Sequence, residues 1–559
     1  MELHVDLLGP FSVELHGLAR LSSQRLLNHA LQGGLMFEQD PAELASQYFA
    51  RQDYSRALFY LQQASSSQPR NPQYLNGMVN CYLQLGDIEN AARITRKILK
   101  IDKKNDALYF QLSQLQFELG DVEGTIAACE RAIDINPREY EYYLYLADFH
   151  EKANQYDRAL DVLSQGLRHF PDAAALQIVS ARCERRLGKL RESFRRLQKL
   201  GEHEAELSPH WRIQYHFEMG FVEDKRDKVD SAFHHFSLAN EYVRSGSEYR
   251  DLDNQHSKKL IRGLTNLDFA RVNEIVDVSR QSPPPLQPVF FVGFPRSGTT
   301  LLEKVLDSHP GINVIEEDNP LGRVNSIVER EPEKYFDSPF LLQVKNIESL
   351  RQIYYNEAAK HVSIDDGRLV VDKLPMNIVQ IHIIKVLFPD ARILLGLRHP
   401  CDSILSCFMQ NFGVNLAMAS MFEFESIVDY YNETMNLWHL FESQMDVASH
   451  SVRYEDLIED MEGEVRNLLR FLDLPWDDDV LNYRQNAFKR GFIKTPSYSQ
   501  VVRPLYKEAR YRWHRYASFF EPWFDCLQPH CKAFGYSLEL PETGPAEPAH
   551  SGRDNVPEA

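Results

Sequence analysis

Hydrophobic and small residues recur with a period of 34 residues through the first part of the chain. One register consists of prolines with a single lysine: Pro69, Lys103, Pro137 and Pro171. A second register carries glycine or asparagine: Gly86, Gly120, Asn154 and Gly188. A third carries small residues: Ala57, Ala91, Thr125, Ala159 and Ser193. The position after the small residue is apolar in every unit: Leu58, Ala92, Ile126, Leu160 and Phe194.

These registers predict a stack of helix–turn–helix units. The small residue lets two helices approach closely, the glycine or asparagine forms the tight turn after the first helix, and the proline begins the next unit. Five units fit between about 38 and 207, and Gly220 with Ala232 indicates a sixth, less regular one. The pattern resembles the tetratricopeptide repeat, which implies a concave surface for a peptide or protein, a dimerisation arm or a structural brace.

The pattern changes at residues 281–288, where QSPPPLQP holds four prolines and ends the helical region. Short apolar runs follow and alternate with amphipathic helices. The predicted strands are 289–293, 368–372, 392–397 and 451–454. This alternation predicts an open, mostly parallel α/β sheet with helices on both faces, preceded by the α-solenoid.

The length of 559 residues predicts more than one domain. We expect, in order, a helical segment over 1–37, the repeat solenoid over 38–246, a helical linker over 247–286, the α/β domain over 287–540 and a disordered tail over 541–559. The tail is rich in proline, glycine, alanine and glutamate, a composition that cannot form a packed core.

Composition narrows the class of protein. Hydrophobic residues make up 43% of the chain and charged residues 25%, as in ordinary soluble globular proteins. The net charge of −18 argues against a nucleic-acid binder, whose surface is normally basic. Any anion site must therefore be a local basic pocket in an acidic protein.

The sequence also favours a cytoplasmic location. It holds no apolar run long enough to span a membrane, and its first residues lack the apolar core of a signal peptide. The seven cysteines form no paired framework, which indicates free thiols in a reducing compartment. The spacing of Cys526 and Cys531 also suits a disulfide or half of a metal site, although no second Cys/His pair accompanies them.

The strand at 289–293 runs into a glycine loop and then an amphipathic helix. Gly293 and Gly298 bracket four residues, the spacing of a Walker A phosphate loop. Thr299 occupies the place of the Walker lysine, and Arg296 lies inside the loop. Loop N–H groups and the helix dipole suit an anion, but Mg-nucleotide triphosphatase chemistry needs the lysine. The sequence therefore predicts an anion cradle with a different chemistry.

The string PRSGTT after an apolar strand resembles the 5′-phosphosulfate loop of sulfotransferases. The longer string FVGFPRSGTTLLEKVLDSHPGINVIEED is similar to tyrosylprotein sulfotransferases and to bacterial tetratricopeptide-repeat sulfotransferases, and the resemblance extends over roughly 286–535. It implies transfer of a sulfuryl group from 3′-phosphoadenosine 5′-phosphosulfate to a hydroxyl, without a metal. It also implies that the donor is bound by the loop residues Pro295, Arg296, Ser297, Gly298, Thr299 and Thr300.

A second motif, RILLGLRHPCDSILSCF, places Arg398 at the end of a predicted strand and Ser406 eight residues later, in a helix that begins at Pro400. Ligands of open α/β sheets bind at the carboxyl ends of strands. A guanidinium and a hydroxyl both suit a phosphate. The resemblance implies that Arg398 and Ser406 hold the 3′-phosphate of the donor.

An acidic triplet follows the loop helix. The resemblance implies that Glu317, 21 residues after Arg296, is the general base that takes the acceptor proton, and that Glu316 helps to position the site. The alternative assignment of the base to Glu316 stays open. Arg323 matches a family arginine near the acceptor. Asn319 departs from the tyrosylprotein enzymes, which carry an arginine there, and this weakens the case for an acidic tyrosine-containing peptide.

Three further cations and hydroxyls complete the predicted site. The resemblance assigns Lys373, in RLVVDKLPMN, to the sulfate and the bridging oxygen, where a cation offsets charge on the leaving phosphate. The segment 489–515 holds eight Lys/Arg and one acid, which suits a polyanion. Within it, Ser497 matches the late family serine that reaches the transferred group, and Arg512 matches a cation at the 3′-phosphate.

Two other classes of function remain compatible with the sequence. One is a kinase-like P-loop enzyme using Mg-ATP, which the missing Walker lysine and the Arg398/Ser406 pair disfavour. The other is a non-catalytic repeat scaffold. The acceptor is not readable from the sequence: a protein tyrosine, a glycan, a lipid or a small alcohol fits the chemistry, and the repeats favour a peptide or protein.

Overall fold

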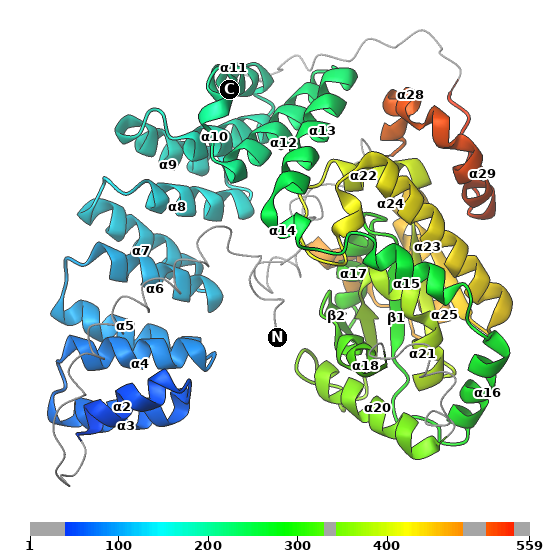
Figure 1. Ribbon diagram of the computed structural model, residues 1–559, viewed down its shortest axis with the longest axis horizontal. Coiled ribbons are helices and arrows are strands. Elements are labelled where there is room, and N and C mark those ends of the chain that lie inside the picture. The colour runs from blue at the N-terminus through cyan, green and yellow to red at the C-terminus, as the bar shows by residue number, and fades with distance from the viewer. Residues whose placement is uncertain (1–39, 329–342, 485–509, 542–559) are drawn as a thin grey trace, which may run out of the picture. The chain divides into compact units, whose positions relative to one another are not determined.

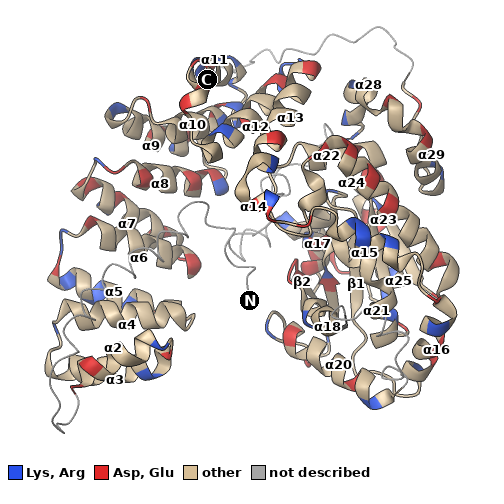
Figure 2. Ribbon diagram, viewed as in Figure 1, with Lys and Arg blue, Asp and Glu red and all other residues tan. Residues whose placement is uncertain are grey.

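The computed structural model describes residues 40–328, 343–484 and 510–541. These residues divide into two compact units. The first contains 40–254, 409–422 and 481–484, and the second contains 255–328, 343–408, 423–480 and 510–541. The predicted helical segment 1–37 and nearly all of the predicted disordered tail lie outside the described residues. Figure 2 shows acidic and basic residues interspersed along the helices of each unit.

The first unit is a stack of helical pairs (Figure 1). Its helices are α2 (Pro41–Ala50), α3 (Tyr54–Ser67), α4 (Pro72–Gln84), α5 (Ile88–Ile101), α6 (Asp106–Glu118), α7 (Val122–Ile135), α8 (Tyr140–Lys152), α9 (Tyr156–His169), α10 (Ala174–Arg186), α11 (Leu190–Gly201), α12 (Pro209–Lys225), α13 (Val229–Ser245) and α14 (Ser247–Arg250). Successive helices pack against each other as the predicted units require. The α-solenoid of the predicted fold class is thus confirmed.

The registers of the sequence have direct structural meaning. The small-residue register is completely buried, because each member lies where two helices touch: Ala57, Ala91, Thr125, Ala159 and Ser193. The turn register adopts left-handed backbone, with positive φ at Gly86, Gly120, Asn154 and Gly188. Gln52, 34 residues before Gly86, has φ 60° and extends this register by one unit. The buried tyrosines 142, 143 and 145 pack between helices.

The sixth pair, α12 and α13, is longer than the others and departs from the register. Its turn has positive φ at Asp227. Gly220 lies inside α12, where a Cβ atom would meet the ring of Phe236 at 2.7 Å. Ala232 is buried in α13. Gly220 therefore serves helix packing in this unit.

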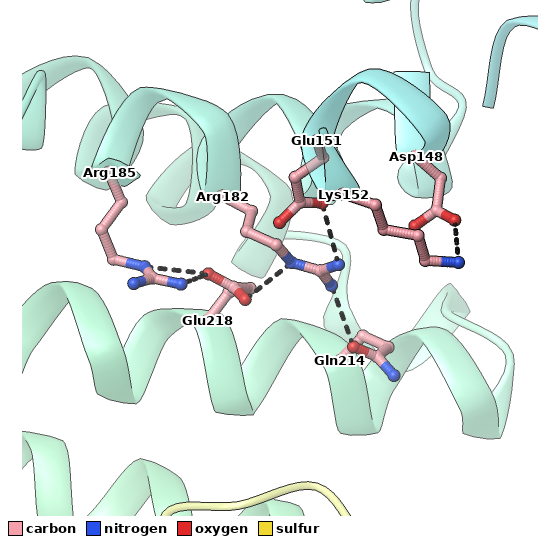
Figure 3. A network of polar contacts seen from close by, with 7 residues as sticks. All are labelled: Asp148, Glu151, Lys152, Arg182, Arg185, Gln214 and Glu218. Atoms are coloured by element: carbon pink, nitrogen blue, oxygen red, sulfur yellow. Dashed lines mark hydrogen bonds and ion pairs between the residues drawn. The ribbon is translucent and has the colours of Figure 1, made fainter. Parts of the chain in front are cut away.

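A network of charges joins three neighbouring helices of the stack (Figure 3). Arg182 of α10 donates from Nε to Oε1 of Glu218 in α12 at 2.8 Å, and Arg185 donates to Oε2 of the same carboxylate at 2.8 Å. Arg182 also reaches Glu151 of α8 at 3.4 Å and Gln214 of α12 at 3.1 Å. Paired charges of both signs thus fix α8, α10 and α12 in one register.

The second unit is built on a five-stranded sheet. The strands are β1 (Val289–Gly293), β2 (Ile312–Glu316), β3 (Leu369–Lys373), β4 (Arg392–Leu397) and β5 (Ala448–Arg453). They lie in the order β2-β3-β1-β4-β5, and every pairing is parallel. The α/β domain with a parallel sheet is confirmed. The sequence missed β2, and it placed β3 one residue early and β5 three residues late.

Helices precede the first strand of this unit and follow each strand. They are α15 (His256–Leu264), α16 (Phe269–Arg280), α17 (Thr299–Asp307), α18 (Pro320–Val328), α20 (Val344–Ala358), α21 (Ile381–Leu387), α22 (Pro400–Phe408), α23 (Phe424–Gln444), α24 (Tyr454–Glu459), α25 (Met461–Phe471), α28 (Ala517–Phe520) and α29 (Phe524–Ala533). The chain runs from β1 toward β2 at one edge and from β4 toward β5 at the other. Right-handed crossovers therefore place helices on both faces.

Aromatic side chains fill the core on one face of the sheet. Phe290 of β1, Tyr354 of α20 and Phe388 are fully buried, with ring centroids 5.1–5.9 Å apart. Strands covered on both faces are apolar along their whole length, as β1 is. Among the described residues, no helix is both long enough and apolar enough to cross a bilayer.

Candidate active site

The glycine loop joins β1 to α17 at the carboxyl edge of the sheet. Arg296 and Gly298 both have positive φ, 69° and 84°, and they enclose Ser297. Alternating backbone handedness of this kind turns successive N–H groups toward one point, which forms an anion-binding concavity. A left-handed arginine costs energy and is typical of a functional site.

Close contacts fix the loop. A Cβ atom at Gly298 would lie 2.4 Å from the ring of Tyr454, and one at Gly293 would lie 2.6 Å from the backbone oxygen of Gly396. Gly396 in turn leaves room for the side chain of Thr299. The loop is therefore seated on the ends of β4 and β5. Four of the predicted donor-binding residues are buried in it: Pro295, Ser297, Thr299 and Thr300.

Arg296 of this loop lies beside a second arginine, Arg398. Arg398 directly follows β4 and donates from Nη1 to the backbone oxygen of Arg296 at 3.3 Å. The Nε of Arg296 donates to Oγ of Ser406 in α22 at 3.2 Å. Burial, with repulsion from Arg398, lowers the pKa of Arg296. The structure thus brings Arg296, Arg398 and Ser406 together, with Ser406 bonded to the loop arginine.

Asp402 and Tyr454 support this arginine pair and were not predicted from the sequence. Asp402, in the first turn of α22, lies 3.9 Å from Nη2 of Arg398. Burial raises the pKa of Asp402 to about 6. The guanidinium of Arg398 also lies over the ring of Tyr454, 5.4 Å from its centroid. These contacts orient the guanidinium of Arg398 beside the glycine loop.

A carboxylate–lysine chain lies beside the loop, at the ends of β2 and β3. Lys373 is completely buried, and its Nζ lies 2.7 Å from Oε1 of Glu317 and 2.6 Å from Oε2 of Glu303. Lys304 lies 2.6 Å from Glu303 and 2.7 Å from Glu316. Nearby carboxylates outweigh the effect of burial and raise the pKa of both lysines. The chain thus runs Glu317–Lys373–Glu303–Lys304–Glu316.

Sheet pairing produces this arrangement. Glu316 ends β2 and is the register partner of Lys373 at the end of β3. The backbone N–H of Glu317 donates to the Lys373 oxygen at 2.9 Å, which continues the ladder into the turn. Glu317 has φ 51° there. The sequence did not identify Glu303 and Lys304, because charges in an amphipathic helix are usually solvated.

Of the three remaining predicted residues, the structure describes Arg323 and Arg512 but not Ser497. Arg323 is exposed on α18. Arg512 begins a short 3-10 helix, and the N–H of the next residue, Trp513, donates to Oδ1 of Asp402 at 2.9 Å. Asp402 therefore links the Arg512 segment to Arg398. Ser497 lies outside the described residues, as does most of the basic segment 489–515.

Comparison with known proteins identifies the class of each unit. Residues 288–478 match the model of the sulfotransferase family, and residues 48–115 and 116–183 match the tetratricopeptide repeat. The resemblance inferred from the residues is therefore confirmed: a sulfotransferase-family domain follows a tetratricopeptide-repeat array.

Particular relatives narrow the comparison. An uncharacterized protein of Aquifex aeolicus (strain VF5) is 30% identical over 333 residues, covering 57% of this chain and 41% of that one. Protein-tyrosine sulfotransferase 1 of Danio rerio is 26% identical over 238 residues, covering 40% of this chain and 65% of that one. The Drosophila melanogaster protein-tyrosine sulfotransferase is 25% identical, covering 40% and 46%. The chain thus spans less than two thirds of the length of each of these relatives.

Solved structures that are similar to part of this chain have low overall similarity to it. The crystal structure of the MamA protein has 17% sequence identity and a TM-score of 0.27, covering 30% of this chain and 91% of that one. TTC0263, a thermophilic tetratricopeptide-repeat protein of Thermus thermophilus, has 22% identity and a TM-score of 0.23, covering 33% and 99%.

Proposed function

We propose that this protein transfers a sulfuryl group from 3′-phosphoadenosine 5′-phosphosulfate to a hydroxyl acceptor. The observation that carries the proposal is the convergence of Arg296 and Arg398 beside a left-handed glycine loop at the N-terminus of α17. The positive charges of these two largely buried arginines repel each other, so a polyanion bound beside them would be stabilised. The residues present therefore fit a phosphosulfate donor.

The donor supplies an activated sulfuryl group whose S–O bond to the 5′-phosphate breaks as the acceptor oxygen forms its bond to sulfur. Loop amides with Arg296, Thr299 and Thr300 would bind the 5′ end, and Arg398 with Arg512 the 3′-phosphate. Lys373 would neutralise charge that develops on the oxygen leaving with the phosphate. Glu317 would accept the proton of the acceptor hydroxyl. Positioning and electrostatics would dominate, as in phosphoryl transfer.

The acceptor proposed is a hydroxyl on a peptide or protein. Two observations support it: relatives of this domain are named protein-tyrosine sulfotransferases, and tetratricopeptide solenoids present a concave surface to protein partners. The exposed Arg323 on α18 would then contact the acceptor, with Glu316 positioning the site.

Calorimetric titration tests the donor assignment. Wild-type protein is titrated with 3′-phosphoadenosine 5′-phosphate and with Mg-ATP, beside Arg398→Ala and Arg392→Ala. Arg392 begins the same strand β4 and pairs with Asp473 at 2.8 Å, so it is a matched control at the opposite end. We expect the bisphosphate to bind, Arg398→Ala to weaken binding by about tenfold to a hundredfold, and Arg392→Ala to leave binding unchanged.

Two outcomes would contradict the proposal. Binding of Mg-ATP without the bisphosphate would favour a kinase-like enzyme. Binding of neither nucleotide by folded wild-type protein would favour a non-catalytic repeat scaffold.

A second experiment tests the acceptor class. It compares the transfer of sulfate from labelled donor to tyrosine-containing peptides with the transfer to simple alcohols.

A further inference from the structure

Glu303 is a carboxylate buried almost completely beneath the candidate site. It lies in the second turn of α17, it is 1% exposed, and it contacts two lysines at 2.6 Å each, Lys304 and Lys373. Burying charges is costly, and a well-packed apolar side chain would stabilise α17 at least as well. The mechanism proposed above does not use Glu303, so the presence of a carboxylate at this buried position needs another explanation.

The two carboxylates that contact Lys373 differ in how freely their side chains can move. Glu303 is enclosed by protein, whereas the side chain of Glu317 is 39% exposed at the end of β2. The backbone of Glu317 is held by its N–H bond to the Lys373 oxygen, so its side chain can turn without moving the strand. An ammonium has three donors. When Glu317 turns to an acceptor hydroxyl, Glu303 is the remaining anionic contact of Lys373 at 2.6 Å.

We propose that Glu303 is a positioning residue for Lys373. Its fixed carboxylate keeps the buried ammonium charged and aimed at the transferred group while Glu317 is released to act as base. This inference rests on the proposed function and deepens it, because it explains how one lysine can serve the donor while its exposed partner serves the acceptor. Lys304 holds Glu303 in turn and connects it to Glu316.

The charge of Lys373 depends on groups from each element around it. α17 contributes Glu303 and Lys304, and the end of β2 contributes Glu316 and Glu317. On β3 itself, the preceding Asp372 is engaged by the Tyr354 hydroxyl at 3.1 Å. A buried lysine that loses one of its two carboxylate partners loses its proton at lower pH than one that keeps both. Removing the charge of Glu303 should therefore make the contact of Lys373 with the donor sensitive to alkaline pH.

The test measures dissociation constants of the phosphosulfate donor between pH 7 and 9.5 for wild type, Glu303→Gln, Glu303→Asp and the control Asp307→Asn, which removes a charge one turn later on α17. We expect wild type, Glu303→Asp and Asp307→Asn to have flat profiles. Glu303→Gln should lose affinity about tenfold per pH unit once Lys373 begins to deprotonate. Lys373→Arg added to Glu303→Gln should restore a flat profile, because a guanidinium stays charged.

Binding of the bisphosphate product, which lacks the sulfuryl group, is the reference measurement. Glu303→Gln should bind it within about threefold of wild type at pH 7, since the loop and the two arginines are untouched. Superimposable pH profiles of wild type and Glu303→Gln, or failure of the arginine rescue, would overturn the inference while leaving the proposed function intact. If wild type bound neither nucleotide, the proposed function would fail, and the inference with it. Glu303→Asp, which retains the charge, covers the case in which Glu303→Gln does not fold.

Discussion

The Nε of Arg296 donates to Oγ of Ser406 across 3.2 Å, although the two residues are 110 positions apart in the chain. This bond ties the glycine loop after β1 to the helix α22 after β4. Ser406→Ala should remove one hydrogen bond to a cation and weaken binding of 3′-phosphoadenosine 5′-phosphate about fivefold to tenfold. Calorimetry measures the change. Ser349→Ala, on the exposed surface of α20, is the control, and equal binding by all three proteins would show that Ser406 is dispensable.

Gly298 combines left-handed backbone with a crowded site. Alanine there would meet the ring of Tyr454 at 2.4 Å in addition to the unfavourable φ of 84°. Gly367→Ala is a matched control, because Gly367 has φ 79° and nothing within 4 Å of the added Cβ. We expect Gly367→Ala to cost about 1 kcal/mol and Gly298→Ala to cost more and to abolish nucleotide binding. Urea unfolding measures the stability of both variants, and equal losses would refute the steric argument.

Glu317→Gln tests the proposed base. The amide cannot accept the acceptor proton, so transfer should fall about a hundredfold to ten-thousandfold, whereas binding of the bisphosphate should be retained. Asp318→Asn is the control, because the carboxylate of Asp318 pairs with His361 at 2.9 Å, whereas that of Glu317 pairs with Lys373. Single-turnover transfer from labelled donor gives the rates. A similar loss in both variants would assign the effect to the general charge of the turn.

Asp372 predicts a specific pH dependence of stability. Burial raises its pKa to about 7, above the usual value of about 3.9, so the folded protein binds this proton more tightly than the unfolded chain. The contribution is fully present below the unfolded pKa and is lost as the pH rises through about 7. Relative to Asp372→Asn, wild type should therefore lose stability between pH 5 and 8, by at most about 1.4 kcal/mol per pH unit.

Tryptophan fluorescence suits this measurement, since four of the five tryptophans, 438, 476, 513 and 523, lie in the second unit. Asp366→Asn is the control. Hydrogen bonds from Arg368 hold the pKa of Asp366 below its usual range, so this group stays ionised between pH 5 and 8 in both states. Parallel pH profiles of wild type and Asp372→Asn would contradict the prediction.

The network of Figure 3 allows a comparison of a buried and an exposed carboxylate in the repeats. Glu218→Ala would leave Arg182 and Arg185 without their shared partner and should destabilise the protein by about 3 kcal/mol. Asp148→Ala would break only the exposed pair with Lys152, at 2.7 Å, and should cost less than about 1 kcal/mol. Thermal unfolding monitored by circular dichroism distinguishes the two, and equal effects would argue against a structural role for Glu218.

The repeat array was predictable because its period encodes local geometry. A left-handed turn selects glycine or asparagine, as at Gly120 and Asn154, and a helix contact selects a small residue, as at Ala91. The sixth unit indicated by Gly220 and Ala232 is present as α12 and α13, but these helices are longer and the turn moves off the register to Asp227. The strand β2 was missed because its five residues include the polar Asn313, which bonds the Ser363 oxygen at 2.7 Å.

The candidate site was predictable where its chemistry lies in one loop or at one strand end, as for Arg296 and Arg398. Glu303 and Lys304 were not found, because their burial depends on Lys373, which is distant in sequence, and on Glu316, which ends the strand β2 that the sequence missed. Asp402 was not identified either, because its burial cannot be read from the sequence. The roles of the site residues, the predicted domain boundaries and the cytoplasmic location stay predictions.

The left-handed turns at Gln52, Gly86, Gly120, Asn154 and Gly188 recur every 34 residues with nearly the same backbone. A stack of this kind can be lengthened or shortened by whole units, because each junction offers its neighbour an equivalent surface. Removal of the stretch between two equivalent turns would join two turns of the same backbone conformation. It would leave the sulfotransferase-family sequence unaltered. The length of the repeat array and the residues of the candidate site are therefore encoded in separate stretches of the chain, and selection can adjust one without rewriting the other.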